Sequence, residues 1–145
     1  MEEVQKNASH GSMSRIVVAS LAGSTVAGIV FGVIMHMMGM VGMISSMVGS
    51  ESLAVGWLIH IMISWIFGLG YGAMTFLSKS FYVLGIIHGV LIWLIGPIIV
   101  MPVMMGMGPM FTQMFAPDQL MSLVTHLMFS LILAFIFKKM ILGKN

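Results

Sequence analysis

The chain has 145 residues, of which 59% are hydrophobic and only 7% are charged, and its formal net charge is +2 at pH 7. An ordinary soluble domain carries charge on about a quarter of its residues, so this composition excludes a water-soluble globular protein. It predicts a one-domain membrane protein that crosses the bilayer several times. The chain contains no cysteine, which excludes disulfide bonds and thiolate metal ligands.

Four apolar segments reach the length of about 20 residues that a helix needs to cross a bilayer. These predicted spans are residues 15–40, 53–77, 81–105 and 119–140. A polar tail of residues 1–14 is expected before them, and a basic tail of residues 141–145 after them. The intervening residues 15–140 are predicted to form one transmembrane domain, and the short connections favour an all-α, up-down-up-down four-helix bundle.

The distribution of charge predicts the orientation of this bundle. If the four spans alternate in direction, all six basic residues fall on one side: Lys6, Arg15, Lys79, Lys138, Lys139 and Lys144. Glu51 and Asp118 fall in the two connections on the other side. The positive-inside rule then places both termini in the cytoplasm, with the chain in the plasma membrane. The basic residues are interpreted as determinants of orientation and not as a surface for nucleic acid.

Each span contains one histidine, at position 36, 60, 88 or 126. Ionisable residues inside membrane spans are energetically costly and usually mark a functional site. Each of these histidines shares a helical stripe with small or hydroxylated residues, as His60 does with Ser64 and Gly68. Such stripes normally form the contacts between membrane helices, so the histidines are expected to face the bundle interior.

The rise of an α-helix predicts which of these histidines can meet. At 1.5 Å per residue, His60 and His126 each lie roughly 10 Å below the outer ends of their spans. By the same rise, His36 lies within roughly 6–12 Å of the outer surface. His88 is counted from the opposite side and therefore lies in the inner third of its span. Three histidines are expected to share an outer layer, from which His88 is absent.

Methionine is unusually frequent, with 19 residues. Six lie within residues 35–47 and six within 101–114, at the outer ends of spans and in the outer connections. Thioether sulfur is a soft ligand suited to Cu(I), and imidazole suits copper, zinc and haem iron. Methionine is also a flexible apolar residue that fills gaps between helices. Its crowding beside three histidines favours a role as a source of ligands.

Two short motifs carry a resemblance to known proteins. They are G-W-x-x-H at residues 56–60 and G-P-x-x-x-M-P at residues 96–102, followed by the histidine at position 126 early in the last span. In these features the chain resembles a group of small bacterial and archaeal four-helix membrane proteins, over most of residues 20–137. The resemblance implies the fold and the importance of His60 and His126, and it carries over no activity and no catalytic residue.

Three functional hypotheses follow from these patterns. In the first, a transition metal, with copper favoured, binds in the outer half of the bundle. Its candidate ligands are His36, His60, His126, Met101, Met104 and Met105. In the second, His60 and His126 are the axial ligands of a b-type haem in an electron carrier. In the third, the chain is an accessory subunit of a larger membrane complex, or a homo-oligomer, in which the histidines hydrogen-bond between helices and no cofactor is bound.

Enzymatic activity has little support in the sequence. No acidic residue lies within any span, and the two outer carboxylates, Glu51 and Asp118, lie in connections. A proton or sodium carrier that uses carboxylates is therefore not indicated, nor is a hydrolase of the serine–histidine–carboxylate type. The chain is interpreted as a non-enzyme.

The predicted topology can be tested by labelling single cysteines placed near Glu51 and near Lys79 in membrane vesicles. Because these positions fall in connections on opposite sides of the four-span arrangement, an impermeant thiol reagent is expected to reach them from opposite sides. Labelling of both from the same side would contradict the topology.

Overall fold

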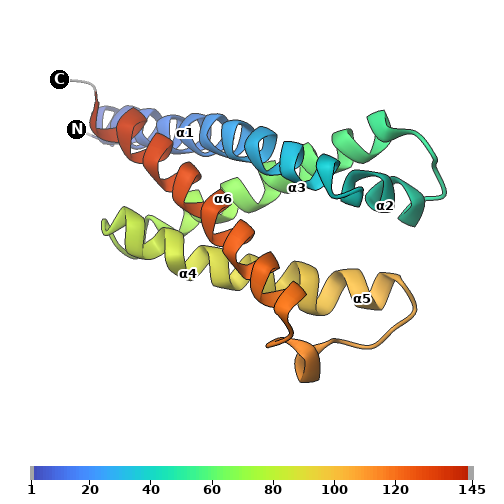
Figure 1. Ribbon diagram of the computed structural model, residues 1–145. Coiled ribbons are helices and arrows are strands. Elements are labelled where there is room, and N and C mark those ends of the chain that lie inside the picture. Colours follow the sequence, from blue (N-terminus) through green and yellow to red (C-terminus); the bar gives the residue numbers. More distant parts are fainter. Residues whose placement is uncertain (1, 144–145) are drawn as a thin grey trace.

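The computed structural model describes the backbone of residues 2–143 and the side chains of residues 12–143. Over this part of the chain the fold is helical, without strands, as the sequence predicts. The elements are α1 (Glu2–Met37), α2 (Met40–Met47), α3 (Leu53–Met74), α4 (Phe81–Trp93), the π-helix η1 (Leu94–Val100), α5 (Met101–Met104), the 3-10 helix η2 (Phe111–Gln113) and α6 (Pro117–Leu142). Figure 1 shows their arrangement.

Four helical stretches are long and apolar enough to cross a membrane: Ser12–Met37, Leu53–Met74, Phe81–Met104 and Pro117–Leu142. Their ends lie within three residues of the predicted spans. The chain thus has the elements of a multi-pass membrane protein. Helix α1 begins at Glu2, so residues 2–14, expected as a polar tail, continue the first helix. The side chains of Lys6 and His10, and residues 144–145 of the expected basic tail, lie outside the described part.

The first span ends earlier than predicted because the backbone turns at Gly39. This glycine has φ +76°, a left-handed conformation that is readily adopted without a Cβ atom. The chain then forms the short helix α2, which the sequence analysis does not predict, and α2 packs against α3. Val41 and Ile44 of α2 form a small buried cluster with Met35, against which Trp57 packs. The first connection is therefore structured and covers one end of α3.

The third span is interrupted by the π-helix η1, which contains Pro97. Proline lacks the backbone N–H that an α-helix requires at this position, and a wider helical turn is one way to accommodate it. Helix α5 continues the span directly from η1 for four residues. The third span is therefore one long helical stretch, Phe81–Met104, whose second half departs from α-helical geometry.

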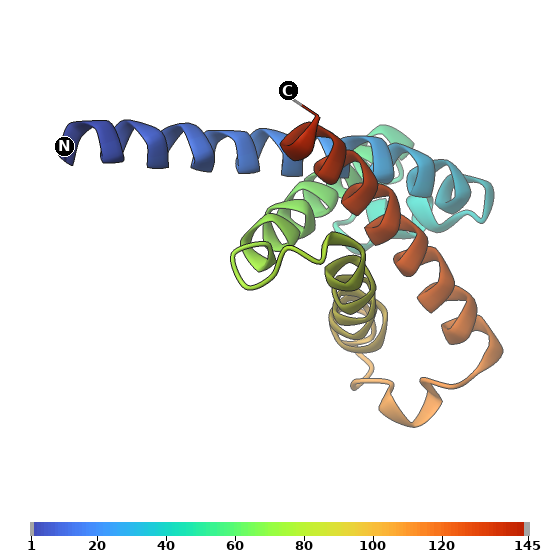
Figure 2. The same cartoon turned by 90° about the vertical axis from the view of Figure 1, so that its left-hand side faces the viewer.

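The four long helices pack in the spatial order α4, α6, α1, α3. Helix α6 lies along both α4 and α1, α1 also lies along α3, and few contacts join α3 to α4. Figures 1 and 2 show this open arrangement, in which α6 crosses the other helices. The main core contains Tyr71, Phe81, Ile92, Leu133 and Phe137. Because α1 stands between α3 and α6, side chains of α1 separate the histidines of those two helices.

Small residues make the contact between α1 and α3 unusually close. A Cβ atom added to Gly28 of α1 would lie 2.7 Å from the Ser64 hydroxyl of α3. One added to Gly68 of α3 would collide with the Ser24 side chain and would lie 2.9 Å from the Ser20 carbonyl oxygen of α1. Apolar side chains gain little by leaving lipid for one another, so close backbone approach through small residues is a main source of association between membrane helices.

Hydrogen bonds connect the helix ends. The Arg15 guanidinium donates to the Ile141 carbonyl oxygen at 2.9 Å, and the Tyr71 hydroxyl donates to the Phe81 carbonyl oxygen at 2.7 Å. At the other end, the Trp93 indole N–H donates to the Gln119 carbonyl oxygen at 3.0 Å. The start of the first span, the α3–α4 turn and the end of α6 thus gather at one end of the molecule, here called the terminal end (Figure 1).

Two glycines on α3 provide a matched test of this packing. Gly68→Ala is expected to lower the free energy of unfolding by about 1–3 kcal/mol, because the added methyl group forces α1 and α3 apart. Gly70 is exposed and has no atom within 4 Å of an added Cβ, so Gly70→Ala is expected to cause no loss of stability. Circular dichroism during SDS-induced unfolding in micelles measures both. Equal stability of the two variants would show that the close contact does not contribute.

Candidate functional site

His60 joins α3 to α1 and keeps one ring nitrogen free. Its side chain is only 4% exposed, and its Nε2 atom lies 2.8 Å from the Gly28 carbonyl oxygen. A carbonyl oxygen can only accept, so the neutral ring carries its hydrogen on Nε2. The Nδ1 atom therefore presents the lone pair that a metal ion requires.

His126 on α6 also has one ring nitrogen bonded to a backbone carbonyl, but in His126 this nitrogen is Nδ1 instead of Nε2. Its Nδ1 atom lies 2.7 Å from the carbonyl oxygen of Ser122, one turn earlier in the same helix. The hydrogen of the neutral ring is therefore on Nδ1, and Nε2 carries the lone pair. The two histidines each combine one nitrogen bonded to the backbone with one nitrogen available to a ligand.

His36 differs, because its lone pair already has a partner. The Trp57 indole N–H donates to Nδ1 of His36 at 3.3 Å, and His36 is exposed near the end of α1. A metal ion would have to replace this hydrogen bond before His36 could act as a ligand. Of the three histidines predicted for the outer layer, His36 is the least available.

A row of aromatic rings connects these three histidines. The ring centroids of His36 and Trp57 lie 6.1 Å apart, and those of Trp57 and His60 lie 6.0 Å apart. Phe31 continues the row, with its centroid 5.7 Å from that of His60 and 5.1 Å from that of His126, both in edge-to-face contact. Phe31 belongs to α1 and thus contacts histidines from both neighbouring helices. This histidine row comprises Phe31, His36, Trp57, His60 and His126.

His88 lies outside the row and has both ring nitrogens engaged. Its Nδ1 atom lies 2.8 Å from the Ser130 hydroxyl, and its Nε2 atom lies 2.9 Å from the Phe67 carbonyl oxygen. The carbonyl accepts from Nε2–H, and Nδ1 accepts from the hydroxyl. His88 therefore links α4 to α6 and to α3, and it has no lone pair left for a metal. Its ring also meets Tyr71 edge to face at 5.6 Å.

The methionines predicted as ligands lie on another part of the fold. Met101, Met104 and Met105 are at α5 or just after it, at the end of the third span. Met104 is 58% exposed and Met105 is 51% exposed. Met35, which is buried, belongs to the cluster against which Phe31 and Trp57 pack. Met35 is not distinguished from the other methionines by its sequence pattern alone, although its spacing of four residues from Phe31 places both on one side of α1.

Within the described residues, no group of three or more histidine or acidic side chains is arranged to hold a metal ion. The histidine row therefore offers two available imidazole nitrogens, with soft sulfur nearby, and not a complete set of nitrogen and oxygen ligands. A two- or three-ligand site of this type suits Cu(I) better than a hard cation.

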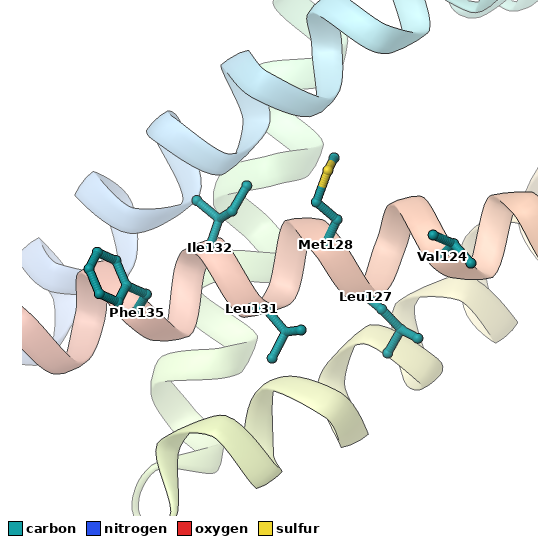
Figure 3. Close-up of a pocket in the computed structure, with 6 residues that line it drawn as sticks. All are labelled: Val124, Leu127, Met128, Leu131, Ile132 and Phe135. Atoms are coloured by element: carbon teal, nitrogen blue, oxygen red, sulfur yellow. The ribbon is translucent and has the colours of Figure 1, made fainter.

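An apolar groove of about 540 Å³ runs along the exposed face of α6 (Figure 3). It is lined by Val124, Leu127, Met128, Leu131, Ile132 and Phe135. No charged or hydrogen-bonding side chain lines it, so it offers no chemistry of its own. A surface of this kind on a membrane helix is suited to contact with lipid acyl chains.

Comparisons with protein-family models, with curated proteins and with solved structures found no match. Membership of the four-helix family that the two motifs suggest stays a prediction. The functional argument therefore depends on the geometry of the histidine row.

The structural role of His88 can be tested by its replacement. His88→Ala is expected to lower the free energy of unfolding by about 2 kcal/mol, because it leaves the Ser130 hydroxyl without its partner inside the bundle. His36→Ala, at an exposed site, is expected to have a much smaller effect. SDS-induced unfolding followed by circular dichroism measures the difference. A larger loss for His36→Ala would contradict this assignment.

Proposed function

We propose that the chain is a multi-pass protein of the plasma membrane, with four spans that alternate in direction and both termini in the cytoplasm. The gathering of Arg15 and Lys79 around one cavity at the terminal end supports this orientation. Glu51 lies in the connection before α3, and Asp118, expected in a connection, lies in the first turn of α6. The positive-inside rule assigns that side to the exterior.

We further propose that this protein binds one Cu(I) ion through Nδ1 of His60 and Nε2 of His126. The observation that carries the proposal is that each ring hydrogen-bonds a backbone carbonyl oxygen through its other nitrogen, at 2.8 Å and 2.7 Å. Histidines that bind metals commonly have this arrangement, which fixes the tautomer and orients the ring. His88 also donates to a backbone carbonyl oxygen, that of Phe67, but its other nitrogen accepts a hydrogen bond from Ser130. His36 accepts a hydrogen bond from Trp57.

The ring of Phe31 limits the space for an ion at this site. This ring contacts both imidazoles edge to face, so an ion shared by the two histidines has to be accommodated next to the ring or in its place. Cu(I) accepts two or three soft ligands, and the thioether of Met35 is a candidate for the third, because Phe31 and Trp57 of the row pack against its cluster. His36 can contribute after release of its bond to Trp57, and Met101, Met104 or Met105 after movement of α5.

Copper is favoured over haem because of the position of α1. This helix packs along both α3 and α6, which carry the two histidines. A haem held between His60 and His126 would need a slot where α1 now stands. A single ion is much smaller than a haem macrocycle and needs no such slot.

A second function, an accessory subunit without a cofactor, is favoured by a different observation. The histidines already join helices, since His60 bonds α3 to α1 and His88 bonds α4 to α6 and α3. In that case His60 stabilises packing and the purified protein carries no metal.

The copper site can be tested with the purified full-length protein and a Cu(I) chelator as competitor. His60→Ala and His126→Ala are each expected to weaken Cu(I) binding by more than about tenfold, or ~1.4 kcal/mol, because each removes a ligand. His88→Ala is the matched control, since it removes a buried histidine with no free lone pair, and it is expected to retain the ion. Binding is also expected to weaken as the pH falls, because protons compete for neutral imidazole.

Equal copper binding by all three variants would refute the site. A Soret band in the absorption spectrum, lost in His60→Ala and His126→Ala, would establish haem in place of copper. Protein that never binds either cofactor, and that co-purifies with a larger membrane assembly, would favour the subunit function.

A further inference from the structure

A second site lies at the terminal end, away from the histidine row. Three parts of the chain enclose a cavity of about 480 Å³ there: the start of the first span, the α3–α4 turn with the first residue of α4, and the end of α6. The lining residues are Ser12, Arg15, Ile16, Thr75, Lys79, Phe81, Phe137, Ile141 and Leu142. Two cations and two hydroxyls thus share the cavity with apolar walls.

Among the residues whose side chains the structure describes, the two cations have only backbone oxygens as hydrogen-bond acceptors. Arg15 donates to the Ile141 carbonyl oxygen at 2.9 Å, and Lys79 donates to the Thr75 carbonyl oxygen at 3.0 Å. A guanidinium has five N–H donors and an ammonium has three, so both retain donors for an anion. The two carboxylate side chains of residues 12–143 lie at the opposite end, Glu51 in the connection before α3 and Asp118 in the first turn of α6. Neither charge is neutralised by an acidic side chain of this part of the chain.

Further positive charge lies at the same end of α6. The Lys138 ammonium is 4.9 Å from the centre of the Tyr82 ring, and the Lys139 ammonium is 5.1 Å from the centre of the Phe135 ring. Neither lysine lines the cavity. They raise the local positive potential, whereas Arg15 and Lys79 supply direct ligands.

We infer that this cavity binds the phosphate group of an anionic phospholipid, with Arg15 and Lys79 as its ligands. Basic pockets between membrane helices commonly hold lipid head groups. The guanidinium of Arg15 can contact two phosphate oxygens at once, and Lys79 adds a point charge. Ile16, Ile141 and Leu142, which also line the cavity and are partly or fully exposed, provide apolar surface for the glycerol and upper acyl region.

A lipid in this position joins α1 to the α3–α4 turn, next to a pair of helices that share few contacts. Helices α3 and α4 share few contacts, although α6 packs well along α4 and α1. A phosphate held by Arg15 of α1 and Lys79 of the α3–α4 turn bridges α1 to that turn. Bound anionic lipid is therefore expected to stabilise the fold as well as occupy the cavity.

Native mass spectrometry of the full-length protein in detergent tests this inference. The protein is mixed with equal amounts of phosphatidylglycerol and phosphatidylcholine. The wild type is expected to retain at least fivefold more phosphatidylglycerol than phosphatidylcholine. The double variant Arg15→Gln, Lys79→Gln is expected to lose this preference, and Lys138→Gln, Lys139→Gln, which removes the same charge outside the cavity, is expected to keep most of it.

Two additional measurements separate the possible causes of a loss. Arg15→Lys, Lys79→Arg retains both charges and is expected to retain the preference, which separates lost phosphate binding from a fold disturbed by substitution. Inorganic phosphate at millimolar concentration is expected not to displace the lipid; full displacement would mean that the site takes free phosphate instead. Equal lipid retention by the wild type and the Arg15→Gln, Lys79→Gln variant, or an equal loss in the Lys138→Gln, Lys139→Gln variant, would overturn the site.

Discussion

The close approach of α1 and α3 is the contact on which the rest of the structure depends. Ser64 of α3 packs against Gly28 of α1, and Ser24 of α1 packs against Gly68 of α3. Neither contact leaves room for a side chain on the glycine. The absence of Cβ atoms lets His60 reach the Gly28 carbonyl oxygen at 2.8 Å. The packing of small residues therefore sets the tautomer of His60, and with it the nitrogen that is available for chemistry.

The four span histidines show how the same residue type acquires different roles from its neighbours. His88 meets a hydroxyl and a carbonyl, so both of its nitrogens are used and it acts as a hydrogen-bonded link between helices. His60 and His126 each meet one backbone carbonyl, and each keeps a lone pair. Burial alone does not distinguish these cases, because His60 and His88 are 4% and 3% exposed. The hydrogen-bond partners of the two ring nitrogens distinguish these histidines.

The two proposed sites use opposite ends of the molecule and opposite kinds of chemistry. The histidine row is uncharged when its imidazoles are neutral, and its soft ligands suit a soft cation. The cavity at the terminal end presents Arg15 and Lys79 to an anion. The same segregation of basic residues that favours a cytoplasmic terminal end also supplies this positive surface. Orientation and lipid binding would then have one electrostatic origin.

The sequence by itself determined the all-α class and the four apolar helices, because length and hydropathy decide which segments can cross a bilayer. It also predicted that His88 lies apart from the other three, since the helical rise is constant. The contact of Phe31 with both His60 and His126, and the short helix α2, follow from how the helices are rotated and packed, which periodicity does not specify. The decisive hydrogen bonds go to backbone carbonyls, and since every residue has one, only the tertiary structure could decide that His60 meets Gly28 and Arg15 meets Ile141.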